Sequence, residues 1–400
     1  MKKIKIVGQP MYNIGDLAAC KALVNLFKAD GNYEVELAFP QNCMVDPEFL
    51  KLKDITIIKN IPKISKVEKI LTILCPNFLK IKLFITNKQK YKHITNADFI
   101  LFSPGGLELG LYKSWNYLWL MATLIALNKK FGIYSRSMGD FRDKTLTDFI
   151  FKRQAIKFLK KSIFNGLRDL KSQQNAQQVK VPFYPAIDVV FSNIPDYVIS
   201  AKISKMIGDN YIVFTPSKFE WHYKLKKYPT ERFSKLYILI LNTIIKNTDK
   251  SIIMLPHLYR ENIDSLYFND LKKKSINPSR IIILEDIPNP DLYQKVIKGA
   301  DFTIAARLHQ IIFSINNRTP FLCLSYEHKM EDMLRILNLD KYSIRIEDLL
   351  GDRFNIKELL IDILSGKKEQ LQEITAAQKK AQKVARNSFH VLLKRLNSIH

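Results

Sequence analysis

The chain has 400 residues, which is long enough for two domains, and 47% of them are hydrophobic, which is enough for a core in each. Its 63 Lys and Arg residues exceed its 38 Asp and Glu residues, so the formal net charge of +25 favours anionic partners. The longest uncharged apolar run, residues 117–127, is too short to cross a bilayer. We therefore expect a folded chain without a transmembrane segment, and we exclude a disordered one.

The first residues and the cysteines indicate a reducing compartment. Residues 1–8 contain charges but no apolar stretch long enough for a signal peptide, and their pattern predicts a first strand. Cys20, Cys43, Cys75 and Cys323 are far apart and lack a metal-binding spacing. We expect reduced thiols in a cytoplasmic protein, and no metal site.

A glycine near Asn and Asp follows the first strand. Asn13, Gly15 and Asp16 stand where a strand turns into a helix, and a glycine there lets the backbone approach a ligand closely. The alternative is a plain turn in which Asp16 caps the helix. The dinucleotide-binding fingerprint is absent, because the chain contains no G-x-G-x-x-G sequence.

A basic segment covers residues 51–96. It carries eleven lysines but only Asp54 and Glu68 as acids. Apolar residues recur between the lysines at helical spacing, among them Ile64, Val67, Leu71 and Leu74. This pattern predicts an amphipathic basic helix, a kind of element that can lie on an anionic membrane surface.

Short apolar runs alternate with helical patterns in the amino-terminal half, which predicts a parallel sheet. The predicted strands include residues 33–39, 97–102 and 131–135, and the clearest helix is residues 115–127. Gly105 and Gly106 follow the strand at 97–102. We expect a tight turn there, or a close approach of the backbone to a ligand.

Two arginines follow predicted strands of this half. Arg136 comes at the end of the strand at residues 131–135, and Arg168 comes directly after another short strand. Asp169 and Ser172 then occupy positions typical of a helix start, so the Arg168 side chain should point toward a cleft at the strand ends. The alternative for Arg168 is an ordinary surface ion pair.

Residues 192–208 have mixed polarity and contain Pro195 and Gly208, so we place the domain boundary there, with domains at 1–195 and 209–345. His257 follows the second strand of the second domain and either faces a ligand or caps a turn beside Pro256. The strands predicted for this domain are residues 211–215, 251–255, 280–284, 302–305 and 321–324.

Arg307, His309 and Lys329 should share one edge of the second sheet. Arg307 and His309 follow the strand at 302–305, and Lys329 follows the next parallel strand. Ligands of open α/β sheets bind at the carboxyl ends of the strands, and these cations suit a small anion with a carboxylate and a phosphate. In the alternative, Arg307 pairs with a structural acid and His309 packs at the helix start.

Residues 346–400 form a Lys-rich tail. Apolar residues recur in it at intervals of three and four, namely Leu371, Ile374, Ala377, Ala381 and Val384. This spacing predicts one helix with a single apolar stripe. The stripe either packs back on the protein or lies on a membrane.

Five motifs in this order resemble those of the polysaccharide pyruvyl transferase family, and together they extend over roughly residues 1–335. They are Asn13 to Asp16, Ser103 to Gly106, Leu167 to Asp169 with Ser172, Ile187 to Phe191, and Arg307 to His309 followed by Lys329. The chain departs from the family pattern at residues 104–107, where the family has a longer glycine run, and at residues 135–139, where it has a Gly-Gln-Gly-like turn.

The resemblance implies an α/β fold with two Rossmann-like domains facing a central cleft, as in GT-B enzymes, and a carboxyl-terminal helical tail. It implies transfer of pyruvate from phosphoenolpyruvate to a sugar of a surface polysaccharide or lipid-linked precursor, as a cyclic ketal and with release of phosphate. No cofactor is implied. The first domain would hold the acceptor and the second the donor.

The resemblance also assigns roles to residues. Catalysis would involve His309, as the acid that protonates the methylene carbon, and Arg307. The donor would be held by Arg168, Arg307, His309 and Lys329. The acceptor side would contain Asn13, Asp16, Gly105, Gly106 and His257.

Two other functions fit the same architecture. One is a GT-B glycosyltransferase that uses a nucleotide sugar, because fold does not fix function. The other is a non-catalytic basic protein that binds a membrane or polyanion, although nucleic acid is disfavoured because no recognised binding module is present. For the favoured function we expect a cytoplasmic enzyme, peripheral on the inner face of the cytoplasmic membrane, where it reaches an acceptor linked to polyprenyl diphosphate.

Overall fold

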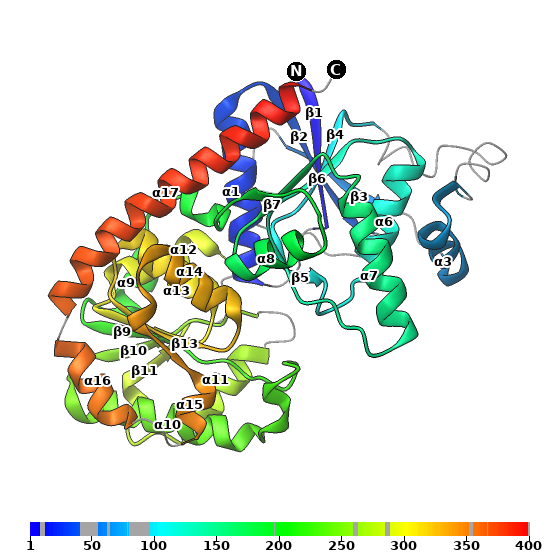
Figure 1. The fold of residues 1–400 in the computed structure, drawn as a ribbon. Helices are drawn as coiled ribbons and strands as arrows, with labels where there is room; N and C mark the ends of the chain where they lie inside the picture. The colour runs from blue at the N-terminus through cyan, green and yellow to red at the C-terminus, as the bar shows by residue number, and fades with distance from the viewer. Residues whose placement is uncertain are drawn as a thin grey trace. The chain divides into compact units, whose positions relative to one another are not determined.

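The structure is a computed structural model of the chain, and it describes residues 1–8, 13–40, 55–61, 65–77, 79, 96–195, 197–258, 263–284, 289–351, 355–365 and 367–398. The chain forms two compact units. Unit 1 contains Met1–Met11, Ala19–Asn193 and Lys383–His400, and unit 2 contains Tyr12–Ala18 and Ile194–Gln382. Each unit is a parallel sheet flanked by helices (Figure 1). The α/β class predicted from the sequence is confirmed.

The sheet of unit 1 has the strand order β3-β2-β1-β4-β6-β7-β8, with β5 paired to β6. All of these pairs are parallel, and the strand order reverses direction between β1 and β4, where Val7 lies opposite Phe102. Such a reversal is the point at which doubly wound sheets bind ligands. The strands are β1 (Lys2–Val7), β2 (Tyr33–Pro40), β3 (Thr56–Ile61), β4 (Phe99–Phe102), β5 (Gly105–Leu109), β6 (Phe131–Met138), β7 (Phe164–Leu167) and β8 (Tyr184–Pro185).

Helices of unit 1 bury apolar side chains against this sheet. The helix predicted at residues 115–127 forms as α6 (Trp115–Ala126), and it is apolar nearly all round because α3 and α7 cover it. The other helices here are α3 (Lys66–Leu74), α7 (Leu146–Leu159), α8 (Leu170–Gln178) and α1 (Ile14–Asp30), whose first residues belong to unit 2. The remainder of the basic segment at 51–96 lies largely outside the described residues.

The sheet of unit 2 has the order β11-β10-β9-β12-β13-β14, and all of its strands are parallel. Its order reverses between β9 and β12. The five predicted strands are present, and β14 was not predicted because its three residues carry too short a pattern. The strands are β9 (Tyr211–Thr215), β10 (Ser251–Met254), β11 (Ile281–Ile283), β12 (Phe302–Ala305), β13 (Phe321–Ser325) and β14 (Ser343–Arg345).

Amphipathic helices cover the sheet of unit 2. In α10 (Thr230–Asn247), residues such as Phe233, Tyr237 and Ile244 recur at helical spacing and are buried in the core. The other helices are α9 (Ala201–Ile207), α11 (Ile263–Lys273), α12 (Pro290–Gly299), α13 (Leu308–Asn317), α14 (His328–Leu337), α15 (Ile346–Leu350) and α16 (Ile356–Ser365).

The tail forms the predicted long helix, α17 (Lys367–Asn397), and its apolar stripe is buried by protein. In unit 2, Gln370 Nε2 donates to the Phe321 carbonyl oxygen at 2.6 Å. In unit 1, the Phe389 ring lies 5.0 Å from the Phe27 ring. The predicted stripe is correct at Ile374, Ala377 and Ala381, but Leu371 is exposed.

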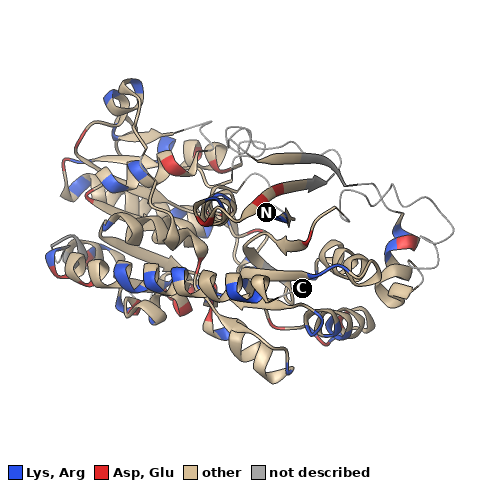
Figure 2. Cartoon of the chain, turned by 90° about the horizontal axis from the view of Figure 1, so that it is seen from above, with Lys and Arg blue, Asp and Glu red and all other residues tan. Residues whose placement is uncertain are grey.

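The tail does not form a unit of its own, because α17 contributes to both units. Lys and Arg recur along its outward side, as Figure 2 shows for the long helix that ends near the carboxyl terminus. Of the two alternatives for this stripe, packing on the protein is the one observed. Within the described residues, no helix is both long enough and apolar enough to span a membrane.

We expect Phe389→Ala to lower the free energy of unfolding by about 3 to 5 kcal/mol, because it leaves a cavity beside Phe27 and Tyr134. Urea unfolding followed by circular dichroism measures the change. Val391→Ala on the exposed side of the same helix is the control. Equal effects of the two substitutions would show that this part of α17 is not packed in the core.

Candidate functional site

The loops that follow β9, β10, β12 and β13 of unit 2 hold most of the predicted site. Arg307 lies between β12 and α13, and it is the N-cap residue of that helix. Within the described residues, neither α13 nor α14 has a side chain that caps its first turn. The backbone N–H groups of a first helical turn bind anions well, so the starts of α13 and α14 are candidate anion-binding positions.

Asp264 holds the Arg307 side chain. Arg307 Nη2 lies 3.2 and 3.4 Å from the two carboxylate oxygens of Asp264, and both side chains are buried. Asp264 Oδ2 also accepts hydrogen bonds from the backbone N–H groups of His257 and Leu258, at 2.8 and 2.7 Å. Asp264 is therefore the structural acid that the alternative interpretation of Arg307 required. Sequence reasoning missed Asp264 because it lies in the first turn of α11, far from Arg307 in the sequence.

One edge of the Arg307 guanidinium remains available. Its Nε is buried and has no hydrogen-bond partner among the described residues. An unpaired buried donor costs about 1 to 3 kcal/mol, so such a group requires an explanation. A planar guanidinium fixed by Asp264 on one side can bind a carboxylate or phosphate with the other.

Gly15 packs directly on the imidazole of His309. A Cβ atom at Gly15 would lie 1.8 Å from His309 Nδ1, which is far inside van der Waals contact. The sequence predicted that this glycine allows a close approach, and the group approached is a side chain of the same chain. The cap of α1 is Asn13, whose Oδ1 accepts from the N–H groups of Gly15 and Asp16 at 2.9 and 3.2 Å. The alternative with Asp16 as the cap is wrong, because Asp16 lies within the first turn of α1.

Asn13 and Asp16 were predicted on the acceptor side with Gly105 and Gly106. That assignment stays a prediction. In the structure Asn13 and Asp16 belong to unit 2, where Asn13 pairs with Leu258 and the His257 carbonyl oxygen accepts from Ile14 N–H at 3.1 Å. The physical reason is that α1 starts against the loop after β10. This start of α1 is therefore beside His257 and His309.

His257 lies parallel to His309. Their ring centroids are 6.1 Å apart with an interplanar angle of 18°. Burial, followed by the positive charges of Arg307, His309 and Lys329, lowers the pKa of His257 well below its ordinary value. The imidazole of His257 is therefore neutral at physiological pH. Among the described residues its buried Nδ1 has no hydrogen-bond partner.

Lys329 belongs to a second buried cluster, together with Glu327 and His222. Lys329 Nζ lies 2.6 Å from Glu327 Oε2, and His222 Nε2 lies 3.5 Å from Glu327 Oε1. His222 Nδ1 accepts from Leu225 N–H at 3.2 Å, which leaves the ring proton on Nε2, facing the carboxylate. Sequence reasoning missed His222, since nothing local links the loop after β9 to β13.

The carboxylate of Glu327 is kept ionised. Burial raises its pKa, but the charge of Lys329 and the hydrogen bonds from His222 and Lys329 outweigh burial and hold the pKa below its ordinary value of 4.5. Glu327 thus fixes the position of the Lys329 ammonium group at the start of α14.

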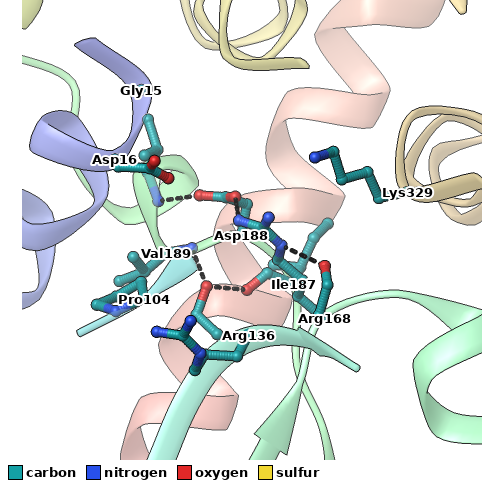
Figure 3. Close-up of polar contacts among 12 residues, drawn as sticks. Gly15, Asp16, Pro104, Arg136, Arg168, Ile187, Asp188, Val189 and Lys329 are labelled. Carbon is teal, nitrogen blue, oxygen red and sulfur yellow. Dashed lines mark hydrogen bonds and ion pairs between the residues drawn. The ribbon is translucent and has the colours of Figure 1, made fainter. Parts of the chain in front are cut away.

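Arg168 is in unit 1, directly after β7 as predicted. Its Nη1 is paired with Asp188 Oδ2, and its Nε donates to Ser137 Oγ at 3.0 Å (Figure 3). Asp169 caps α8 by accepting from Ser172 N–H at 2.8 Å, which confirms the predicted helix start. The surface ion pair considered for Arg168 is wrong, because Arg168 and Asp188 are both buried.

Gly105 does not form the expected tight turn. It begins β5, opposite Arg136 of β6, and a Cβ there would lie 3.3 Å from both terminal nitrogens of Arg136. Arg136 is buried, its Nη1 donates to the Ser103 carbonyl oxygen, and its guanidinium lies 4.6 Å from the Tyr117 ring. Arg136 therefore ties the carboxyl ends of the strands of unit 1, with Gly106 next in β5.

The structure thus divides the predicted residues between the units. Unit 2 brings together Arg307, His309, Lys329 and His257, with Asn13 and Gly15 beside them. Unit 1 holds Arg168, Gly105 and Gly106. The parts of the chain that are described contain no group of three or more His, Cys, Asp or Glu side chains that could hold a metal ion.

Comparisons with known proteins identify relatives in sequence and in fold. The sequence model of the family described as polysaccharide pyruvyl transferase matches residues 13–328. Anabaena HepE in complex with UDP and glucose has a similar structure, with 14% identity, a TM-score of 0.58 and full coverage of both chains. The UDP-GlcNAc 2-epimerase of Neisseria meningitidis, bound to UDP-GlcNAc, has 12% identity and a TM-score of 0.59, over 98% of this chain and 100% of that chain.

The structure of S. aureus MnaA with UDP is similar as well, with 12% identity and a TM-score of 0.60 over 100% of this chain and 98% of that chain. At these identities the likeness concerns the fold alone. It shows that the chain has a GT-B-like fold of two Rossmann-like units, together with a long carboxyl-terminal helix.

Glu327→Gln should lower the free energy of unfolding by roughly 3 kcal/mol at pH 7, because it removes one partner of a buried ion pair. The pKa of Glu327 is lower in the folded than in the unfolded state. The carboxylate therefore stabilises the folded state fully above about pH 4.5, and this stabilisation is lost as the pH falls further. The difference between parent and variant should therefore shrink below that pH. Urea unfolding across pH measures it, with Glu369→Gln in an exposed pair as control.

On the role of acid that the family resemblance implies for His309, Gly15→Ala should reduce turnover of pyruvyl transfer by about 10²-fold, because the added methyl group displaces the His309 ring by about an ångström. In an ordinary helix the same substitution stabilises by about 1 kcal/mol. Steady-state kinetics of both single variants and of the double variant with His309→Ala test this. Gly15→Ala should have no further effect in the His309→Ala background.

Proposed function

We propose that this chain, which belongs to the polysaccharide pyruvyl transferase family, transfers pyruvate from phosphoenolpyruvate to a sugar as a cyclic ketal and releases phosphate. The acceptor is a sugar of a surface polysaccharide or of its lipid-linked precursor. The observation that carries the proposal is the group of Arg307, His309 and Lys329 beside the two uncapped helix starts of unit 2.

The donor is a small anion with two charged ends. Phosphoenolpyruvate carries a carboxylate and a phosphate, which match a planar guanidinium and a lysine ammonium. Arg307 is held by Asp264, and Lys329 is held by Glu327. Because these two side chains are already held in place, binding of an anion costs little additional side-chain entropy.

His309 is the candidate acid. In the first step its imidazolium gives a proton to the methylene carbon of the donor, and a sugar hydroxyl oxygen bonds to the neighbouring carbon. That hydroxyl loses its proton, which restores the acid. Gly15 and His257 enclose the ring of His309, which limits the orientations open to it.

Closure of the ketal needs a second hydroxyl of the same sugar. The bond to the phosphate oxygen breaks, phosphate leaves, and the second hydroxyl bonds to the same carbon as it loses its proton. The departing phosphate takes up that proton in the overall balance.

The remaining assignments follow the family resemblance. Arg168 is a candidate for the donor, and its pairing with Asp188 would orient the guanidinium. Gly105 and Gly106 are candidates for the acceptor, since they lie at the carboxyl edge of unit 1, after β4. Asn13 and Asp16 are candidates for positioning His257 and His309, in addition to contacting the acceptor.

The experiment is to incubate the pure protein with phosphoenolpyruvate and candidate lipid-linked sugars. Phosphate release together with a product of the mass of a pyruvyl ketal supports the proposal. Turnover of a nucleotide sugar with release of a nucleoside diphosphate would instead support the glycosyltransferase alternative. No product in either assay, with binding to polyanions, would support the non-catalytic alternative.

Two variants should separate binding from proton transfer. Arg307→Ala should weaken donor binding by about 1.5 to 3 kcal/mol, because a charge-assisted hydrogen bond is lost. His309→Gln should keep most of the donor affinity but lower turnover by about 10² to 10⁴. Calorimetry and phosphate release measure the two effects.

The matched controls are Arg335→Ala and His390→Gln, which change exposed residues of α14 and α17. Both controls should leave affinity and turnover at the level of the parent. If His309→Gln stayed within a few-fold of the parent at saturating donor, the acid would be another residue.

A further inference from the structure

Helix α3 exposes the apolar side that a water-soluble helix normally buries. Val67, Ile70, Leu71 and Leu74 follow one another at intervals of three, one and three residues, so they share one face. Their side chains are 66%, 55%, 38% and 46% exposed. Four large apolar side chains on nine residues form a continuous stripe.

The opposite face of α3 is turned toward the protein, and its buried residues are Glu68, Thr72 and the core residue Ile73. Within the helix, Thr72 Oγ1 donates to the Glu68 carbonyl oxygen at 2.7 Å. Lys69 Nζ donates to Asn116 Oδ1 at 2.8 Å and lies 6.0 Å from the Trp119 ring. The contacts of Lys69 with α6 hold α3 in this orientation, so the apolar stripe faces away from the protein.

Further exposed apolar residues lie at the starts of α6 and α7. The bond from Lys69 to Asn116 places α3 beside the start of α6, and the ion pair of Lys113 with Asp148 joins that start to α7. We call these residues, with the α3 stripe, the α3–α6–α7 apolar surface. The added residues are Tyr112, Trp115, Leu146 and Phe149.

This surface lies toward the carboxyl edge of the sheet of unit 1. Helices α6 and α7 each follow a parallel strand, so their first residues stand at the edge where those strands end. Gly105 and Gly106, the acceptor-side candidates, follow β4 at the same edge. A ligand brought to the apolar surface would therefore arrive at the same edge of the sheet as these acceptor-side candidates.

The composition fits an anionic membrane. In sequence, the segment at residues 51–96, which includes α3, has eleven lysines and two acids. Lys66 and Lys69 belong to α3 itself, and each Lys near an anionic surface contributes roughly 1 kcal/mol. Trp and Tyr together with branched apolar residues are the side chains that lie at a membrane interface. By contrast, α17 is rich in lysine but its apolar stripe is buried. Of the two basic helices, α3 is the one that offers an apolar face.

We propose that the α3–α6–α7 apolar surface docks unit 1 on an anionic lipid membrane. The proposal rests on the proposed function for one point, namely that the membrane supplies a lipid-linked sugar. Docking would bring that sugar to the carboxyl edge of unit 1. A second copy of this chain is the competing occupant, and the test distinguishes it.

The test is co-sedimentation of the full chain with two kinds of vesicle. One contains equal parts of phosphatidylglycerol and phosphatidylcholine, and the other contains phosphatidylcholine alone. The parent should bind the first kind preferentially, and the binding should weaken with salt, because screening limits exposed charges to about 8 Å at physiological ionic strength. Replacement of the stripe by Val67→Ser, Ile70→Ser, Leu71→Ser and Leu74→Ser should lower the partition coefficient at least about tenfold.

Three controls complete the test. Val198→Ser with Leu266→Ser removes exposed apolar residues of unit 2 and should leave binding unchanged. Lys379→Glu with Lys380→Glu on α17 should have a smaller effect than the stripe variant. Leu146→Ser with Phe149→Ser keeps α3 intact and should also weaken binding, which guards against misfolding of the stripe variant.

Equal binding to both vesicles, or unchanged binding of the stripe variant, would overturn the proposal. So would self-association of the parent that the stripe variant abolishes, since a second copy would then be the occupant. Phosphate release from phosphoenolpyruvate with a water-soluble acceptor should be the same in parent and stripe variant. Loss of membrane binding with that activity intact separates this inference from the proposed function.

Discussion

The carboxylate of Asp264 is the interaction on which the site of unit 2 depends. It accepts from two backbone N–H groups after β10 and pairs with Arg307 after β12, so one buried charge fixes two loops that belong to different strands. A buried charge is costly unless it is paired, and removal of one partner leaves the other uncompensated. The position of His257 beside His309 depends on this carboxylate, because Asp264 Oδ2 accepts the backbone N–H of His257.

Glu327 plays the equivalent part for Lys329, so each cation proposed for the donor has its own acid. Pairing with a structural acid was the alternative considered for Arg307, yet such a pair is compatible with ligand binding. A cation held by one acid keeps its remaining donors in a fixed direction, whereas a free lysine or arginine would sample many rotamers. The same ion pairs can therefore stabilise the loops and orient the cations toward a ligand.

The sequence was sufficient for features set by local pattern. Apolar runs such as residues 211–215 predicted buried parallel strands, and the spacing of Ile374, Ala377 and Ala381 predicted α17. It was insufficient where distant segments meet. Asp264 and His222 carry no local signal of their partners, and Gly15 indicated a close approach without revealing that His309 is the group approached. For Gly105 the sequence predicted a tight turn or a close approach to a ligand. It did not reveal the pairing with Arg136 in the sheet, because that pairing depends on the strand register.

The division of α17 between the two units has a consequence for synthesis of the chain. Unit 1 contains the first strand but also Lys383–His400, whose buried residues complete its core beside Phe27 and Tyr134. Domains made during translation usually fold in order from the amino terminus. Here unit 1 lacks part of its core until the residues of α17 from Lys383 onward have left the ribosome, so it cannot complete its folding before all of unit 2 has been made.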